Sequence, residues 1–243
     1  MKQVIVIPAR MSGTRLPGKP LIKIKGIAMI ERVWNQCKKV KEEKNIFVAT
    51  EDNLIKEFCD NKGIQCVNTG KAPTAIDRVK LFSDQVDADS YINVQGDEPI
   101  VNPEDINSIL KYNTRFPKRV VFGKTRATKE EFNDYSKAKV VCSRNGKLLY
   151  CSRAGIPLNN KGNFDEASRA IWIYAFNKES LNNYFDAKGD STLEEIEDTE
   201  ILRFLEINIP VYCIDLIGDS WAVDEYKDLK EVEKRLENFE KFS

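Results

Sequence analysis

Short apolar runs alternate with helix-forming segments over the first hundred residues of this chain, and this alternation restricts the fold more than any other feature. Residues 4–7 are β-branched and end at Pro8, which is typical of a strand buried on both faces of a parallel sheet. We expect strands at 4–7, 46–49, 65–67 and 91–94, and amphipathic helices at 28–40, 52–61 and 77–86. The pattern predicts an α/β fold with a doubly wound, mostly parallel sheet.

The stretch from about 118 to 210 has a different pattern. Strands are expected there at 120–123, 138–142, 148–151 and 171–176, followed by leucines and isoleucines at helical spacing over 192–206. We expect a smaller mixed β subregion here that carries the dimerisation surface. A strand at 211–216 and a helix at 225–239 complete the chain. No repeat or long linker interrupts residues 1–243, which predicts a single domain.

Composition excludes several classes of function. The 38 lysines and arginines balance the 38 aspartates and glutamates, so no excess of positive charge favours nucleic acid or an anionic membrane surface. No run approaches the roughly 20 apolar residues that span a bilayer. The chain has no histidine and no C-x-x-C pair, which excludes zinc sites of the usual spacing and nucleophiles activated by histidine. The six cysteines are expected to be reduced core thiols: Cys37, Cys59, Cys66, Cys142, Cys151 and Cys213.

A basic turn follows the first predicted strand directly. It carries three cations, Arg10, Arg15 and Lys19, among small residues that offer hydroxyls and backbone amides. Ser12, Gly13, Thr14 and Gly18 are these small residues. The segment could be a solvated basic turn, but it lies at the carboxyl end of a parallel strand, where open α/β sheets bind ligands. This position favours a triphosphate-binding loop, although neither the P-loop nor the dinucleotide fingerprint is present.

Two aspartates are candidates for a metal site. Asp97 follows the predicted strand at 91–94, and Asp224 precedes the last predicted helix. Mg²⁺ prefers one or two carboxylates together with phosphate oxygens and water, so these two residues would suffice if the fold brings them together. The alternative for Asp224 is that it only caps the final helix.

Five motifs occur in the order found in one family. They are PARMSGTRLPGKPL at 8–21, IFVATED at 46–52, VQGDEP at 94–99, LLYCSRAGIP at 148–157 and VDEYKDL at 223–229. Through them the chain resembles the CMP-Kdo synthetases (3-deoxy-manno-octulosonate cytidylyltransferases), and the similarity extends over nearly the whole sequence. The family's Ser-Thr pair in the first motif corresponds here to Ser12-Gly13-Thr14.

The resemblance implies a role for individual residues. Those expected to bind CTP are Arg10, Ser12, Gly13, Thr14, Arg15, Lys19 and Arg78. Asp97 and Asp224 would hold Mg²⁺ and, with Arg15 and Lys19, act in catalysis. The residues expected to bind the acidic sugar are Gln95, Arg153, Tyr174 and Glu200. The subregion at 118–210 would therefore also contribute to the acceptor site.

The chain departs from the family at positions near the acceptor. Ala170 stands where the family has a histidine, Trp172 replaces a glycine, and Ile201 replaces a glutamine. The family's Ser-Gly-Thr segment is Thr74-Ala75-Ile76 here. Losing polar contacts would leave sugar hydroxyls unpaired at about 1–3 kcal/mol each, which favours an acid other than Kdo as an alternative acceptor.

The predicted activity is transfer of CMP from CTP to an acidic sugar, Kdo or a related 3-deoxy-2-keto sugar acid. An acceptor oxygen would attack the α-phosphorus directly and pyrophosphate would leave. The resemblance further implies a cytoplasmic homodimer that activates sugars for lipopolysaccharide or capsule. Three alternatives remain open: another acidic acceptor, another nucleotide base, or a nucleotide-binding module without catalysis.

Overall fold

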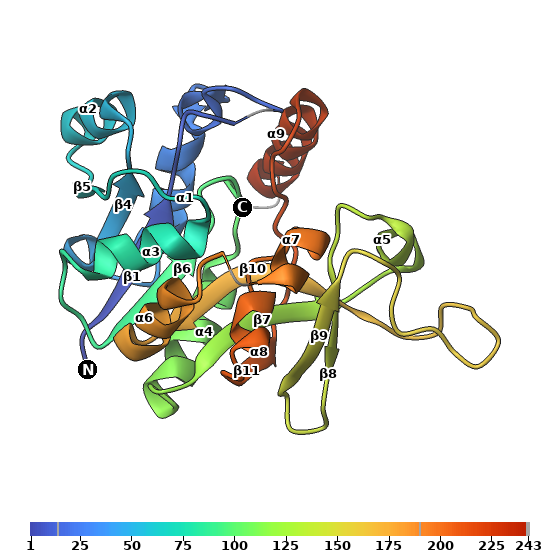
Figure 1. Cartoon of the computed structure of the whole chain (residues 1–243). Coiled ribbons are helices and arrows are strands. Elements are labelled where there is room, and N and C mark those ends of the chain that lie inside the picture. Colours follow the sequence, from blue (N-terminus) through green and yellow to red (C-terminus); the bar gives the residue numbers. More distant parts are fainter. Residues whose placement is uncertain (14, 190, 242–243) are drawn as a thin grey trace.

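The protein is described by a computed structural model that covers residues 1–13, 15–189 and 191–241, with side chains to residue 237. A nine-stranded sheet forms its centre and helices cover both faces (Figure 1). The strands of this sheet are β1 (Gln3–Pro8), β4 (Ile46–Thr50), β5 (Cys66–Asn68), β6 (Ser90–Val94), β7 (Val120–Arg126), β8 (Lys139–Cys142), β9 (Leu148–Ser152), β10 (Ser168–Phe176) and β11 (Val211–Asp215). A separate two-stranded ribbon pairs β2 (Lys23–Ile24) with β3 (Ile27–Ala28).

The sheet is mostly parallel, as predicted. Its strand order is β11-β7-β10-β6-β1-β4-β5, and β10 runs antiparallel to both of its neighbours in this order. The chain builds outward from β1 through β4 to β5, then returns to place β6 on the opposite side of β1. Where the strand order reverses in this way, a crevice forms beyond the carboxyl ends of the neighbouring strands, here β1 and β6. Ligands of α/β proteins bind in such a crevice.

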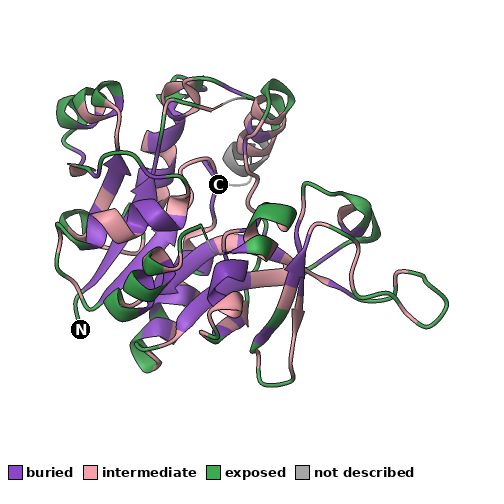
Figure 2. Ribbon diagram, in the orientation of Figure 1, coloured by how far each residue is buried: buried purple, intermediate pink, exposed green. Residues whose placement is uncertain are grey.

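Helices pack on both faces of the sheet. They are α1 (Met29–Lys38), α2 (Asn53–Lys62), α3 (Ala75–Ser83), α4 (Pro103–Arg115), α5 (Lys129–Asn133), α6 (Lys178–Asp186), α7 (Thr192–Glu197), α8 (Leu202–Glu206) and α9 (Tyr226–Lys241). Residues of β1 alternate between two cores: Val4 and Val6 pack with α3, α6 and α8, whereas Ile5 and Ile7 pack with α1, α2 and α4. Figure 2 shows the buried strands between half-exposed helices.

The subregion at 118–210 is partly continuous with the central sheet. Its β7 and β10 are inner strands, whereas β8 and β9 form a hairpin that projects from the main layer (Figure 1). All six cysteines are free; four are buried as predicted, and Cys66 and Cys142 are half-buried. No helix within the described ranges combines the length and apolar character needed to cross a membrane.

Two helical segments differ from the sequence-based expectation. The single helix expected over 192–206 is divided into α7 and α8, because Asp198 adopts a left-handed conformation with φ 46°. Arg153 donates hydrogen bonds to the carbonyl oxygens of Glu197 and Asp198, which an uninterrupted helix would use internally. Asp52 precedes α2 as expected, but its carboxylate accepts the backbone N–H of Met11 rather than one from the helix.

Gly96 allows β6 to approach the end of β1. A Cβ at this position would lie 2.5 Å from the carbonyl oxygen of Pro8 and 3.3 Å from Cδ1 of Ile30. We expect Gly96→Ala to lower the free energy of unfolding by about 1–3 kcal/mol, because the backbone must move, and to weaken CTP binding by displacing Asp97. Urea denaturation and CTP titration measure the two effects.

Gly162→Ala is the control for this substitution. Gly162 lies in an exposed turn with φ +74° and no atom within 4 Å of an added Cβ. This variant should lose some stability through backbone strain and retain normal CTP binding. Equal CTP affinity in Gly96→Ala and the native protein would contradict the proposal that Gly96 sets the position of Asp97.

Candidate active site

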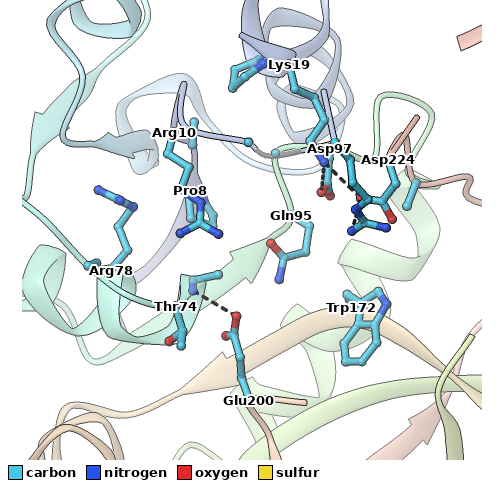
Figure 3. A pocket seen from close by; sticks show the side chains of 18 of the residues that line it. Pro8, Arg10, Lys19, Thr74, Arg78, Gln95, Asp97, Trp172, Glu200 and Asp224 are labelled. Atoms are coloured by element: carbon cyan, nitrogen blue, oxygen red, sulfur yellow. Dashed lines mark hydrogen bonds and ion pairs between the residues drawn. The ribbon is translucent and has the colours of Figure 1, made fainter. Parts of the chain in front are cut away.

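A cavity of about 360 Å³ opens where the strand order reverses, beyond β1 and β6. Segments far apart in the sequence line it: the basic turn, the start of α3, the loop after β6, the end of β9, β10, the α7–α8 turn and the segment before α9 (Figure 3). The predicted site residues among its lining are Arg10, Gly13, Arg15, Lys19, Arg78, Gln95, Asp97, Arg153, Tyr174, Glu200 and Asp224. Ser12 is not part of this lining, and Thr14 lies outside the described residues.

The basic turn has a defined backbone conformation. The Met11 carbonyl accepts the N–H groups of Gly13 and Gly18, at 2.9 and 3.0 Å, while Asp52 holds the Met11 amide at 2.8 Å. Gly18 has φ 71°, a region that glycine adopts without steric cost, and a 3₁₀ turn at Lys19–Leu21 follows it. The turn therefore reverses the chain and directs Lys19 into the cavity (Figure 3).

Lys19 connects the two predicted metal ligands. Its Nζ lies 2.7 Å from Oδ2 of Asp97 and 3.3 Å from Oδ1 of Asp224. Arg15 also contacts Asp224, with Nη2 at 3.0 Å from Oδ1. Burial alone would lower the pKa of Lys19, but the two carboxylates outweigh this effect, so its pKa is above the ordinary value. The ammonium is thus held in its charged form between the aspartates.

Asp224 does not act as the cap of α9. The carboxylate of Asp228 instead accepts the backbone N–H groups of Asp224 and Glu225. A backbone hydrogen bond of 2.9 Å from Val223 to the carbonyl of Asp97 joins the two acidic segments, and Val223 and Val232 pack in a core with Ile24 beneath α9. This packing explains why two aspartates so distant in sequence meet at one ammonium.

The donor set fits a magnesium ion. Asp97 and Asp224 offer two carboxylates on a single cation, with side chains 31% and 37% exposed, leaving room for phosphate and water ligands. Within the described part of the chain, no cluster of three or more acidic, cysteine or histidine ligands occurs. A two-carboxylate arrangement favours Mg²⁺ that shares its coordination with a nucleotide over an ion enclosed by protein ligands.

Arg10 and Arg78 extend the positive side of the cavity. Arg78 is only 2% exposed and donates to Thr69 and to the carbonyl oxygen of Gly70, and it pairs with Glu51. Burial lowers its pKa. Arg10 is exposed and donates only to the carbonyl oxygen of Pro73 in the described structure, so its guanidinium retains donors for a phosphate.

Arg153 and Tyr174 lie at the opposite end of the cavity, where the resemblance predicts the acceptor. The Arg153 guanidinium donates to the α7–α8 turn and pairs with Asp198, whose Oδ2 lies 2.9 Å from Nη2. Tyr174 is 1% exposed and its ring stacks on Phe122 at 5.1 Å. Burial raises the pKa of this phenol well above its ordinary value. Tyr174 therefore contributes a fixed wall, whereas Arg153 supplies positive charge.

Glu200 joins the acceptor end to α3. Its carboxylate accepts the backbone N–H groups of Ala75 and Ile76, at 3.1 and 3.0 Å, in the first turn of that helix. Backbone amides make these contacts, so Ala75 and Ile76 need no polar side chains for them. Burial raises the pKa of Glu200 to about 7, and the two amides oppose that shift.

Several further lining residues were not predicted as part of the site, among them Trp172, Asp198 and Thr199. Trp172 had been noted only as a departure from the family. Its ring packs 5.6 Å from Phe122 and lies near Gln95 and Asp224 (Figure 3). Asp198 and Thr199 reach the cavity only because the helix is interrupted between α7 and α8. The apolar residues over 192–206 follow helical spacing throughout, so the sequence does not reveal this interruption.

Residues 4–215 match the Cytidylyltransferase family. A 3-deoxy-manno-octulosonate cytidylyltransferase of Koribacter versatilis is 35% identical over 97% of this chain and 90% of its own length. A solved CMP:2-keto-3-deoxy-manno-octonic acid synthetase complexed with CTP is 30% identical, with a TM-score of 0.91 over 98% of this chain and 99% of the other. The chain belongs to the CMP-Kdo synthetase family of cytidylyltransferases.

A second kind of relative within this cytidylyltransferase family carries a different acceptor in its name. An 8-amino-3,8-dideoxy-manno-octulosonate cytidylyltransferase of Shewanella baltica is 32% identical over 97% of this chain and 99% of its own length. Family membership thus agrees with the predicted fold and with the use of CTP, and it includes relatives named for more than one sugar acid.

Glu200 should make the stability of this cytidylyltransferase depend on pH. Its folded pKa of about 7 exceeds the ordinary 4.5, so between these values the native state binds more protons than the unfolded state and the free energy of unfolding falls as pH rises. We expect Glu200→Gln to lose less stability than the native protein between about pH 5 and pH 7. Urea denaturation across this range measures the difference. Parallel curves would contradict it, and Glu179→Gln, on an exposed face of α6, is the control.

Proposed function

We propose that this protein transfers CMP from CTP to a 3-deoxy-2-keto sugar acid with release of pyrophosphate. The observation that carries the proposal is the meeting of Lys19, Asp97 and Asp224 at the carboxyl ends of the central strands, beside Arg15. Carboxylates for a divalent ion and cations for a triphosphate therefore occupy one wall of a single cavity. The relatives named as cytidylyltransferases support CTP as the donor.

Arg10, Arg15 and Lys19 would bind the triphosphate. Bidentate contacts from arginine and a point charge from lysine stabilise the negative charge that develops on the pyrophosphate as it leaves. Asp97 and Asp224 would hold Mg²⁺, which supplies charge neutralisation and lowers the pKa of a bound hydroxyl. A bond forms between the acceptor oxygen and the α-phosphorus while the bond to pyrophosphate breaks, so no covalent enzyme intermediate is required. Arg78 and Gly13 would lie beside the nucleotide.

The acceptor would bind near Gln95, Arg153, Tyr174 and Glu200. Arg153 is the cation at this end and suits the carboxylate of a sugar acid. The apolar residues Ala170 and Ile201 and the bulky Trp172 support an alternative, which is that the preferred acid differs from Kdo. Assays of CMP transfer to a panel of octulosonic, nonulosonic and smaller acids distinguish these acceptors.

We also propose that the enzyme is a cytoplasmic homodimer whose product feeds lipopolysaccharide or capsule synthesis. Exposed apolar side chains in the 118–210 subregion support a dimer surface there: Tyr135 is 72% exposed, Leu149 on β9 55% and Leu158 54%. Sedimentation analysis of the native protein and of Leu149→Lys tests this surface, because a charged residue should weaken an apolar contact.

Pyrophosphate release tests the whole proposal. The protein is incubated with Mg²⁺, a sugar acid and CTP, UTP, ATP or GTP in turn, and release with CTP should greatly exceed the others. Binding of CTP without release of pyrophosphate from any acid would instead favour the nucleotide-binding module. Equal release with another nucleotide would overturn the assignment of the base.

Asp97→Asn should reduce turnover by at least about 100-fold, because an amide oxygen carries no negative charge with which to hold Mg²⁺. The midpoint of thermal unfolding should change little, since the side chain is partly exposed. Initial rates of pyrophosphate release at saturating CTP measure the effect. Asp60→Asn, in an exposed ion pair with Lys56 on α2, is the matched control. If Asp97→Asn keeps a turnover near the native value, Asp97 does not hold the metal ion.

Asp198 competes with an acceptor carboxylate for Arg153. Its own carboxylate is 90% exposed while it pairs with the guanidinium, and an exposed pair of this kind is weak and readily exchanged. We expect Asp198→Asn to lower KM for the sugar acid by up to about fivefold, with kcat and KM for CTP unchanged. Asparagine tolerates the left-handed conformation of residue 198, so the turn should persist. A higher KM, or no change relative to the exposed control Asp165→Asn, would contradict the competition.

A further inference from the structure

A second cavity adjoins the first on the far side of Trp172. It has a volume of about 120 Å³ and lies between the start of β8, strand β10 and the start of α9. Four residues line both cavities: Arg15, Trp172, Ala222 and Asp224. Ala170 also lines the second cavity, and its small side chain takes up little of the space. The two cavities are therefore neighbours that share Trp172 and Asp224.

Glu98 provides a buried acceptor in this second cavity. The residue is only 4% exposed and lines the cavity, and its Oε2 has no hydrogen-bond partner in the described structure. A buried carboxylate oxygen left unpaired has lost its hydration without gaining a hydrogen bond in exchange, which is unfavourable. Such a group is therefore a marker for a ligand that donates a hydrogen bond to it.

Lys137 provides a donor in the same cavity. Its ammonium lies 5.0 Å from the ring of Trp221, and the described structure shows no carboxylate paired with it. The other cations of the cavity are already engaged: Arg169 with Glu131, Arg15 with Asp224 and Lys227 with Glu225. Lys137 and Glu98 both line this cavity, so it contains a donor and an acceptor.

This pair of groups selects one class of ligand. A phosphate or carboxylate would be repelled by Glu98, an ammonium would be repelled by Lys137, and an apolar group would leave Glu98 unpaired. A hydroxyl donates to the carboxylate and accepts from the ammonium, so it satisfies both. A chain bearing hydroxyls on adjacent carbons can do this at two positions, while its carbon backbone packs on the indole of Trp172.

We propose that the second cavity binds the hydroxylated tail of the sugar-acid acceptor, with Glu98 and Lys137 as its specificity determinants. This inference rests on the proposed function, because the tail belongs to the same acceptor whose oxygen attacks CTP. It places the acceptor across both cavities, with its carboxylate end near Arg153, its reacting oxygen beside Asp97 and Asp224, and its tail beyond Trp172.

The test compares 3-deoxy-manno-octulosonate with an analogue shortened by its terminal hydroxymethyl group. In the native enzyme, shortening should lower kcat/KM by about tenfold or more, as expected for hydrogen bonds to charged groups. In Glu98→Gln and in Lys137→Ala this penalty should shrink to about twofold or less, since the first variant replaces a charged partner of the terminal hydroxyl by a neutral amide and the second removes a charged partner. Lys44→Ala, in an exposed pair with Glu42 far from both cavities, should retain the full penalty.

The outcomes separate this inference from the function on which it rests. The inference about the second cavity is overturned if CMP is transferred to both acids and shortening has no effect on kcat/KM. It is also overturned if Glu98→Gln and Lys137→Ala keep the full penalty for shortening. Either result leaves the proposed function intact. No transfer of CMP to either acid by the native enzyme overturns the proposed function, and this inference with it. Lys137 is half-buried at the cavity, so Lys137→Ala remains informative if Glu98→Gln fails to fold.

Discussion

The ion pairs of Lys19 with Asp97 and Asp224 are the interaction on which the rest of the site depends. Two carboxylates held this close would repel each other without a cation between them. The Lys19 ammonium, 2.7 Å from one and 3.3 Å from the other, supplies that cation. It also joins three segments: the basic turn after β1, the loop after β6 and the segment before α9. Under the proposed function Asp97 and Asp224 would hold a divalent ion, and Lys19 would then be available to the phosphates of the nucleotide.

The two ends of the main cavity are built in different ways. The end that carries Lys19, Asp97 and Asp224 rests on the carboxyl ends of inner strands and on backbone hydrogen bonds such as that from Val223 to Asp97, so its charged groups have fixed positions. The end proposed for the acceptor depends on side chains at the turn between α7 and α8 and on the indole of Trp172. Arg153 is held there by carbonyl oxygens of the α7–α8 turn, and Asp198 occupies part of its guanidinium. Under the proposed function, this division would allow the acceptor to vary while the groups that bind the nucleotide stay in place.

Much of the fold could be predicted because its elements have strong local signals. The β-branched run in β1 and the apolar spacing of α1 indicate their structures without reference to other parts of the chain. The failures have tertiary causes. The helix expected over 192–206 is interrupted because the Arg153 guanidinium, just after β9, donates hydrogen bonds to two carbonyl oxygens that a continuous helix would use internally. Helices α4 and α6 had not been predicted, although Asn102 and Asn177 cap them in the structure. A single capping residue is a weaker signal than a periodic apolar face.

The sequence by itself determined the alternation of strands and helices, the absence of histidine chemistry, and the charged residues available for a nucleotide, because each depends only on residue type and spacing. Only the tertiary structure decided that Asp224 meets Asp97 and leaves the capping of α9 to Asp228. It alone revealed the unpaired oxygen of Glu98 and the second cavity that shares Trp172 with the first. The local residue pattern of a segment determines whether it can form a strand or a helix. The distances between segments follow from packing the two cores of the sheet, which no single stretch of sequence encodes.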